Sequence, residues 1–255
     1  MRTHAATAGV LLAALACAGA GDTAAQTLDR RIGSAPDGTV RFSFAAREGV
    51  CGNGHNVNID DSRNADWESD CDNGPVRTVL TVSGGKVTRI RSYVGGRWRP
   101  AGAGVTDLGT VSAREAATYL LALAGRAPAG SNEAVFAATL ADSAVIWPEL
   151  VRLAKNESVP RETRRSAVFW LGQAAGAAAT ASLDSLIGDP KGDRQVREAA
   201  VFALSQRPHD EGVPALIRVA QTDRDPDIRK KAIFWLGQSD DPRALALFED
   251  LLTKR

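Results

Sequence analysis

The octapeptide SAVFWLGQ at residues 166–173 recurs as KAIFWLGQ at residues 231–238. Weaker copies of this pattern surround Phe136 and Phe202, so the phenylalanines at 136, 169, 202 and 234 are spaced by 33, 33 and 32 residues. A second apolar register keeps the same spacing and comprises Leu150, Leu183, Leu216 and Phe248. A fixed period of this length is typical of repeat architectures in which each unit is one supersecondary element. The two registers together predict that each unit is a pair of helices.

Prolines mark where these helices are expected to begin and end. Pro148 and Pro214 fall where the second helix of a unit should begin, a position at which proline costs no helical hydrogen bond. Asp-Pro dipeptides at 189–190 and 225–226 fall between units. The first helix of each unit is apolar at consecutive positions, so we expect it to be covered on several sides, with the repeated phenylalanine, such as Phe202, at an internal interface. Stacked hairpins of this kind form a solenoid.

The units resemble the short HEAT-like repeats of phycobilisome lyases and of many bacterial proteins. An arginine opens the first helix of three units, at Arg164, Arg197 and Arg229. The resemblance is good over residues 160–255 and weaker over 131–155, where this arginine is missing. It implies an α-solenoid over residues 131–255 and says little about function. The lyase activity is not carried over, because the solenoid contains no cysteine.

The first 25 residues have the pattern of a secretory signal peptide. A basic start is followed by an apolar run at 8–18 and by small residues that favour cleavage near Ala25. The run is shorter than the roughly 20 residues that a membrane-spanning helix needs. An alternative is a lipid anchor on Cys17, because the residues before it resemble a bacterial lipobox with its leucine one place late. We therefore expect an exported protein, periplasmic or extracellular, with no membrane span.

Residues 38–99 show the alternation of β-strands instead of a helical period. The stretches 39–44, 76–82 and 86–94 alternate apolar and polar residues, and a Ser-Gly-Gly sequence between the last two favours a tight hairpin turn. Once the leader is removed, Cys51 and Cys71 are the only cysteines, which in an exported chain predicts a disulfide.

The organisation that follows from these patterns is an α+β fold in four parts. We expect a signal peptide at 1–25, a small disulfide-linked antiparallel β unit at 38–99, a linker with a connecting helix at 100–130, and the solenoid at 131–255. Within the third part, the residues from Ser112 to Glu115 have the pattern of a capping box at the start of the connecting helix.

Charge is strongly divided inside the expected β unit. Residues 60–72 hold six acids and one base, whereas residues 76–99 hold six bases and no acid. The two segments could pair with each other or be separately solvated. Alternatively, the oxygen-rich loop could bind Ca²⁺ through Asn56, Asn58 and Asp60, although the EF-hand spacing fails at its glycine and glutamate positions. A further interpretation is that Arg97 and Trp98, with the hairpin, bind an anionic envelope component.

Several function classes find no support in the sequence. The 31 basic and 30 acidic residues nearly cancel, which argues against nucleic acid as the main partner. Nucleophile-elbow, phosphate-loop, dinucleotide and HExxH motifs are absent, and His209 is expected in a solvated loop. We therefore expect no enzyme and no cofactor.

Candidate partner-binding residues come from the solenoid. Trp170 and Trp235 occupy equivalent positions in two units, where they either pack in the core or line a groove that anchors a partner. Arg218 lies on the polar side of an amphipathic second helix. We expect a non-catalytic protein-binding or scaffold module in a bacterial cell envelope. The alternative is a ligand or metal-ion sensor that uses the β unit for binding and the solenoid as a docking platform.

Overall fold

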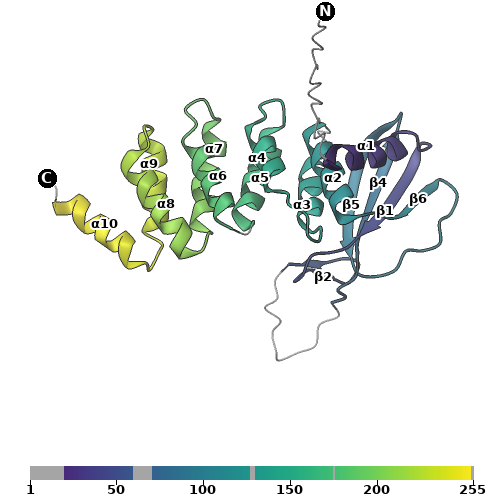
Figure 1. Ribbon diagram of the computed structural model, residues 1–255, viewed down its shortest axis with the longest axis horizontal. Helices are drawn as coiled ribbons and strands as arrows, with labels where there is room; N and C mark the ends of the chain where they lie inside the picture. Colours follow the sequence, from purple (N-terminus) through teal and green to yellow (C-terminus); the bar gives the residue numbers. More distant parts are fainter. Residues whose placement is uncertain (1–19, 60–70, 127–129, 175, 254–255) are drawn as a thin grey trace, which may run out of the picture.

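The computed structural model describes residues 20–59, 71–126, 130–174 and 176–253. A small β region lies at one end, and helical hairpins extend away from it in a row that ends with α10 (Figure 1). The expected α+β fold class is therefore confirmed. Most of the expected signal peptide, including Cys17, lies outside the described residues. No described helix has the length and apolar character needed to cross a bilayer.

Four strands form the main sheet, in the order β5-β4-β1-β6. β1 (Gly38–Phe44), β4 (Val76–Ser83) and β5 (Lys86–Val94) are antiparallel neighbours. The predicted tight turn joins β4 to β5, and Gly84 and Gly85 adopt the positive φ angles, 57° and 69°, that such a turn requires. A second, two-stranded sheet contains β2 (Cys51–Gly52) and β3 (Val57–Asn58).

The fourth strand corrects the expected linker. β6 (Val105–Thr110) pairs in parallel with β1, so the sheet continues into the stretch 100–130 that we had assigned to a linker and a helix. Its hydrophobic pattern is weak because it is an edge strand with no buried side chain and with Gly109 at a φ of 71°. Pairing with β1, instead of a strong strand pattern of its own, holds this segment in the sheet.

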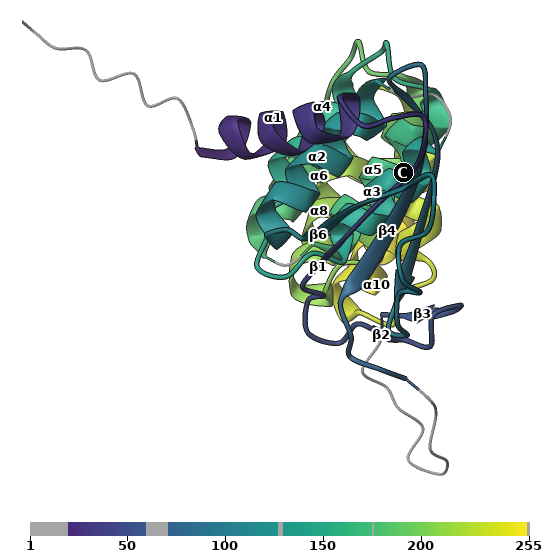
Figure 2. The ribbon, with the colours of Figure 1, turned by 90° about the vertical axis from the view of Figure 1, so that its right-hand side faces the viewer.

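Two helices pack together beside the sheet. α1 (Ala20–Gly33), which the sequence analysis did not predict, lies alongside α2 (Ala113–Arg126) and buries Leu28 and Ile32 (Figure 2). α2 is the predicted connecting helix, and the Ser112 hydroxyl accepts the expected capping bond from the Glu115 N–H at 3.1 Å. Tyr119 of α2 meets the sheet through an edge-on contact with Phe42, with the ring centroids 6.3 Å apart.

The predicted disulfide is present between Cys51 and Cys71, whose Cα atoms are 5.3 Å apart. Next to it, the backbones of Gly52 and Asp72 exchange two hydrogen bonds. The disulfide therefore closes a loop of the chain that includes most of the acidic segment, whose residues 60–70 lie outside the described part of the chain.

Eight helices form four hairpins in the region of the repeats. Each hairpin pairs a first helix with a second, and the bounds are α3 (Ser131–Thr139) with α4 (Trp147–Lys155), α5 (Arg161–Gln173) with α6 (Ala177–Ile187), α7 (Arg194–Ser205) with α8 (His209–Thr222), and α9 (Pro226–Leu236) with α10 (Pro242–Thr253).

Pro148 lies in the first turn of α4 as expected, but the expected position of Pro214 is wrong. α8 begins at His209, because the Pro208 carbonyl already accepts the N–H groups of Glu211 and Gly212. Pro214 therefore lies inside the helix, and His209 is its first residue instead of a loop residue.

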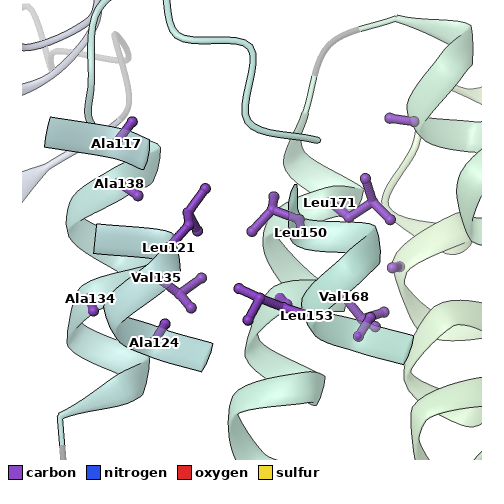
Figure 3. Close-up of a cluster of buried hydrophobic side chains, with 14 of the residues drawn as sticks. Ala117, Leu121, Ala124, Ala134, Val135, Ala138, Leu150, Leu153, Val168 and Leu171 are labelled. Carbon is purple, nitrogen blue, oxygen red and sulfur yellow. The ribbon is translucent and has the colours of Figure 1, made fainter. Parts of the chain in front are cut away.

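The core runs without interruption from the sheet into the hairpins. Figure 3 shows where α2 meets the solenoid: Ala117, Leu121 and Ala124 of α2 lie against Ala134, Val135 and Ala138 of α3, with Leu150, Leu153, Val168 and Leu171 beyond them. Small side chains in the first two helices allow close approach. α2 thus acts as the first layer of the stack, and the β region and the hairpins share one hydrophobic interior.

The repeated phenylalanine does not face this interior. Phe169 is 42% exposed and Phe234 is 55% exposed, while Phe136 and Phe202 are half-buried. Phe202 does pack against Trp235 of the next unit, as expected for an interface between units, but it is only half-buried and lies outside the hydrophobic interior. At 100° per residue, Ala167, Val168 and Leu171 share the core face of α5 and Phe169 falls almost opposite to them.

Candidate functional site: an aromatic groove beside the sheet

The outward phenylalanines form two clusters with the repeated tryptophans. Trp170 lies between Phe136 of the preceding unit and Phe169 of its own, with ring centroids 5.6 and 5.1 Å away. The second cluster, two units further along, comprises Phe202, Trp235 and Phe234, with centroid distances of 4.9 and 5.0 Å. Both tryptophans are half-buried. Each therefore packs partly on the core and partly lines the surface, which combines the two interpretations that the sequence allowed.

The first cluster borders a groove of about 410 Å³, which we call the junction groove. Trp147 and Trp170 supply its aromatic lining, and Val145, which is 75% exposed, stands at its edge. The described residues around it are Arg47, Thr139, Ala141, Ala144, Val145, Ile146, Trp147, Trp170, Gln173 and Ala174. Pockets with an apolar, aromatic lining and a few polar groups are typical binding sites.

Main-chain contacts between the β region and the connection from α3 to α4 keep this groove open. The connection between α3 and α4 covers residues 140–146, whereas the corresponding connection between α7 and α8 covers only 206–208. The longer connection bonds to the segment after β1: the Asp142 N–H donates to the Ala45 carbonyl at 3.0 Å, and the Arg47 N–H donates to the Leu140 carbonyl at 2.8 Å. The chain is thereby held to the β region and leaves one side of Trp170 uncovered.

The same connection contains an unusual backbone conformation. Ser143 has a φ of 51°, and no other non-glycine residue in the described ranges has a positive φ. Such a conformation is uncommon for serine and persists only where surrounding contacts impose it. Here the constraint is the attachment of the connection to the β region on one side and to α4 on the other.

Arg47 is the single charged side chain among the described residues that line the junction groove. Its Nε–H donates to the Thr139 carbonyl at 3.0 Å, which fixes the guanidinium at the edge of the groove. The terminal nitrogens of Arg47 have no acceptor among the described residues, and no described carboxylate lies within ion-pair distance. Within the described part of the chain, the groove therefore offers apolar surface together with one cation that no described acid neutralises.

The equivalent position in the second cluster is much smaller. Trp235 and Gln238 correspond to Trp170 and Gln173, but the hollow that they line measures about 140 Å³. The early start of α8 fills the space that the longer connection leaves open in the first unit. The Nε1 atom of Trp235 is buried and has no hydrogen-bond partner in the described structure.

Arg218 lies in a hollow of about 680 Å³ between α6 and α8. Arg218 is paired with Asp184 at 3.0 Å, and the buried Arg197 in the same hollow is paired with Asp223 at 2.9 Å. Both arginines are therefore already neutralised by aspartates, and neither is available to bind a charged ligand. The hollow is therefore better explained as part of the contact between units than as a binding site.

Arg97 and Trp98 lie on the loop between β5 and β6. Trp98 packs over two arginines of the sheet, with the guanidinium carbon of Arg41 4.9 Å and that of Arg77 5.5 Å from its ring centroid. Asp107 of β6 pairs with Arg41 at 2.7 Å. Burial raises the pKa of Asp107, but the Gly109 N–H and Arg41 lower it more, so the net pKa lies below its usual value. Trp98 thus has a structural role, and Arg97 remains exposed.

The proposed calcium ligands are not assembled in the described structure. Asn56 is exposed, and its N–H donates to Asn53 Oδ1 at 2.9 Å in a local turn. Asn58 is exposed on β3, and Asp60 lies outside the described residues. Among the described residues no group of acidic, histidine or cysteine side chains could hold a metal ion.

Part of the chain matches a known protein family. The family of HEAT repeats matches residues 190–255, which cover α7 to α10 almost completely. No curated protein matches the chain. The last two hairpins are thus similar to HEAT repeats, and the preceding hairpins share their period and geometry.

The sequence analysis identified Trp170 but missed the other residues of the junction groove. Arg47 lies outside the repeats and is separated from Thr139 by 92 positions in the chain. Val145 and Trp147 lie where the connection from α3 reaches α4, at which the first unit departs from the others. No local pattern brings these residues together. The nearest signal was the poorer agreement with the repeat over 131–155, where the connection departs from the other units.

Proposed function

We propose that the protein is a non-catalytic scaffold that binds another protein through the junction groove. HEAT repeats generally serve as protein-interaction scaffolds, and the match over residues 190–255 supports that role. The observation that carries the proposal is the aromatic groove itself. It presents Trp147 and Trp170 to solvent at a position where the stack of helices is held open. Buried aromatic anchors of this kind dominate the energy of protein interfaces.

The compartment is part of the proposal. We place the protein outside the cytoplasm, in the envelope of a bacterium, either periplasmic or extracellular. The Cys51–Cys71 disulfide supports this location because such bonds persist in oxidising compartments. The pattern of the first 25 residues supports export independently.

A site-specific crosslinking experiment tests the proposed docking site. A photoreactive amino acid replaces Val145, at the edge of the groove, in protein produced in its own cells. A matched chain carries the same group at Leu245 of α10, which is 59% exposed and lies in the last hairpin. We expect discrete adducts with a second protein from position 145 and none of the same mass from position 245.

Specificity is checked by adding Trp170→Ala to the Val145 probe. Loss of this ring removes one wall of the groove, so the adduct should fall at least tenfold. An adduct that is unchanged by Trp170→Ala, or one formed equally from Leu245, would contradict the proposal.

A further inference from the structure

We infer that the junction groove binds a peptide segment in which an apolar side chain stands next to a carboxylate. This inference rests on the proposed function and names the chemistry of the partner. Trp147 and Trp170 would cover the apolar side chain, and the terminal nitrogens of Arg47 would bind the carboxylate. Either an acidic side chain or the carboxyl end of a chain could supply that group.

Charge is the first argument for this occupant. Arg47 contributes the single charge of the described groove lining, and no described acid neutralises it. Glu48 follows Arg47 in the chain, and the main chain of Asp142 is bonded to Ala45, but neither acid makes an ion pair with Arg47 within 4 Å. The Asp142 carboxylate accepts from the Ser143 hydroxyl at 3.0 Å instead. The half-buried guanidinium therefore complements a negatively charged partner better than a neutral or basic one.

Preorganisation is the second argument. The bond from Arg47 Nε–H to the Thr139 carbonyl fixes the plane of the guanidinium, and the Arg47 main chain is tied to Leu140. An arginine held in this way leaves its two terminal nitrogens directed at an acceptor and loses little side-chain entropy on binding. Hydrogen bonds between charged groups are also the strong ones, so a carboxylate gains more here than an amide.

Other hollows and charged surfaces of the molecule are weaker candidates for a binding site. The hollow at Arg218 has no aromatic lining, and its Arg197 and Arg218 are already paired with aspartates. The hollow at Trp235 is about a third as large as the junction groove. Arg89 and Arg91 on β5 are exposed, but they line none of the hollows compared above. Among these described hollows, including the one that Lys86 lines between α1, the β4–β5 turn and α2, the junction groove is the one in which two tryptophans lie beside a half-buried arginine whose terminal nitrogens have no described acceptor.

The test uses N-acetylphenylalanine and its amide as a pair of small probes that differ only in the carboxylate. Each is titrated into the isotope-labelled full chain while the indole N–H signals of Trp147 and Trp170 are followed by NMR, with Trp147→Phe and Trp170→Phe for assignment. We expect both indole signals to shift saturably with the acid at millimolar concentrations and about tenfold more weakly with the amide.

Arg47→Gln should abolish this preference without removing the apolar binding, so that acid and amide bind alike. Arg91→Gln makes the same charge change on the exposed face of β5 and should leave the preference intact. If Arg47→Gln folds poorly, the same titrations are made with the parent protein in about 0.5 M salt. Screening of the Arg47 charge should then reduce the preference for the acid over the amide.

Equal binding of acid and amide to the parent protein would overturn the inference, as would shifts confined to the Trp235 signal. Either result leaves the Val145 crosslinking experiment unaffected. Crosslinks from Val145 without a carboxylate preference would show that the groove binds a partner of different chemistry. If neither Val145 crosslinks nor a preference for the acid probe is found, the proposed function is contradicted as well.

Discussion

Arg207 is the most extensively bonded single side chain in the described structure. It is only 6% exposed, and its guanidinium donates to the main-chain carbonyls of Gly172, at the end of α5, and of Ala174 and Gly176, in the connection to α6. It also donates to Thr180 at 2.9 Å and to Glu211 at 2.7 Å. The hydrogen bond that Glu211 accepts from Thr180, and then the one that it accepts from Arg207, hold the pKa of Glu211 below its usual value. One buried cation thus joins the second and third hairpins.

Replacing this side chain should destabilise the protein strongly. We expect Arg207→Ala to lower the free energy of unfolding by about 3 kcal/mol or more, because the carbonyls at 172–176 lose their donors inside the structure. Arg218→Ala is the matched control: Arg218 is 53% exposed and pairs with Asp184 at the surface, so its loss should cost less than about 1 kcal/mol. Urea denaturation of both variants makes the comparison, and similar losses would refute this account.

The importance of Arg207 could not be predicted from the repeat. The matching positions of the two preceding units hold Ala141 and Ala174, so no periodic signal singles it out. Arg197, in contrast, was visible as a repeated arginine, although its partners Asp223 and Asp225 were not identified. Periodicity reveals what the units share, whereas Arg207 and Arg47 act at contacts that occur once.

At the scale of elements, aspartates cap the later helices. The carboxylate of Asp193 accepts N–H groups at the start of α7, Asp225 does so at α9, and Asp241 accepts the Arg243 N–H at the start of α10. The pKa of Asp241 is lowered to about 2, chiefly by the Arg243 side chain and then by that backbone bond. A backbone bond from Asp227 is the largest cause that lowers the pKa of Asp225. These carboxylates therefore stabilise the helices in their ionised form.

Acid should weaken this stabilisation in a defined window. Because the pKa of Asp241 is about 2 in the folded protein and near 3.8 when unfolded, its contribution is complete above about pH 4 and is lost as the pH falls through 2. Asp241→Asn should therefore be less stable than the parent at pH 6, and the gap in unfolding midpoint should narrow towards pH 2. The exposed neighbour Asp240→Asn is the control, and a gap that is independent of pH would contradict the assignment.

The elements themselves were predicted unequally. The four hairpins, the β4–β5 turn and the cap at Ser112 follow from local chemistry and periodicity, which the structure confirms. β6 and α1 were missed because both are specified by what they pack against: β6 pairs with β1, and α1 lies against α2. The start of α8 was misplaced because Pro214 is accommodated inside the helix, with Pro208 and not Pro214 preceding its first turn.

At the scale of the whole molecule, the two ends of the helical stack differ. α2 and the sheet cover the first hairpin, so its inner side chains, such as Leu150, are completely buried. The last hairpin has no described element beyond α10, and Leu245, Leu251 and Leu252 are at least half exposed there. In a solenoid, stability is a sum of the terms within each unit and between neighbouring units. The same residue type should therefore matter differently at different positions in the stack.

Leu186 and Leu251 allow this to be tested with identical chemistry. They occupy the same repeat position, in α6 and α10, yet Leu186 is 3% exposed and Leu251 is 50% exposed. Leu186→Ala should leave a cavity between neighbouring units and cost about 2 to 5 kcal/mol. Leu251→Ala removes a side chain already half in water and should cost less than about 1 kcal/mol. Chemical denaturation measures both losses, and a loss at Leu251 that equals the loss at Leu186 would mean that the outer face of α10 is covered in solution.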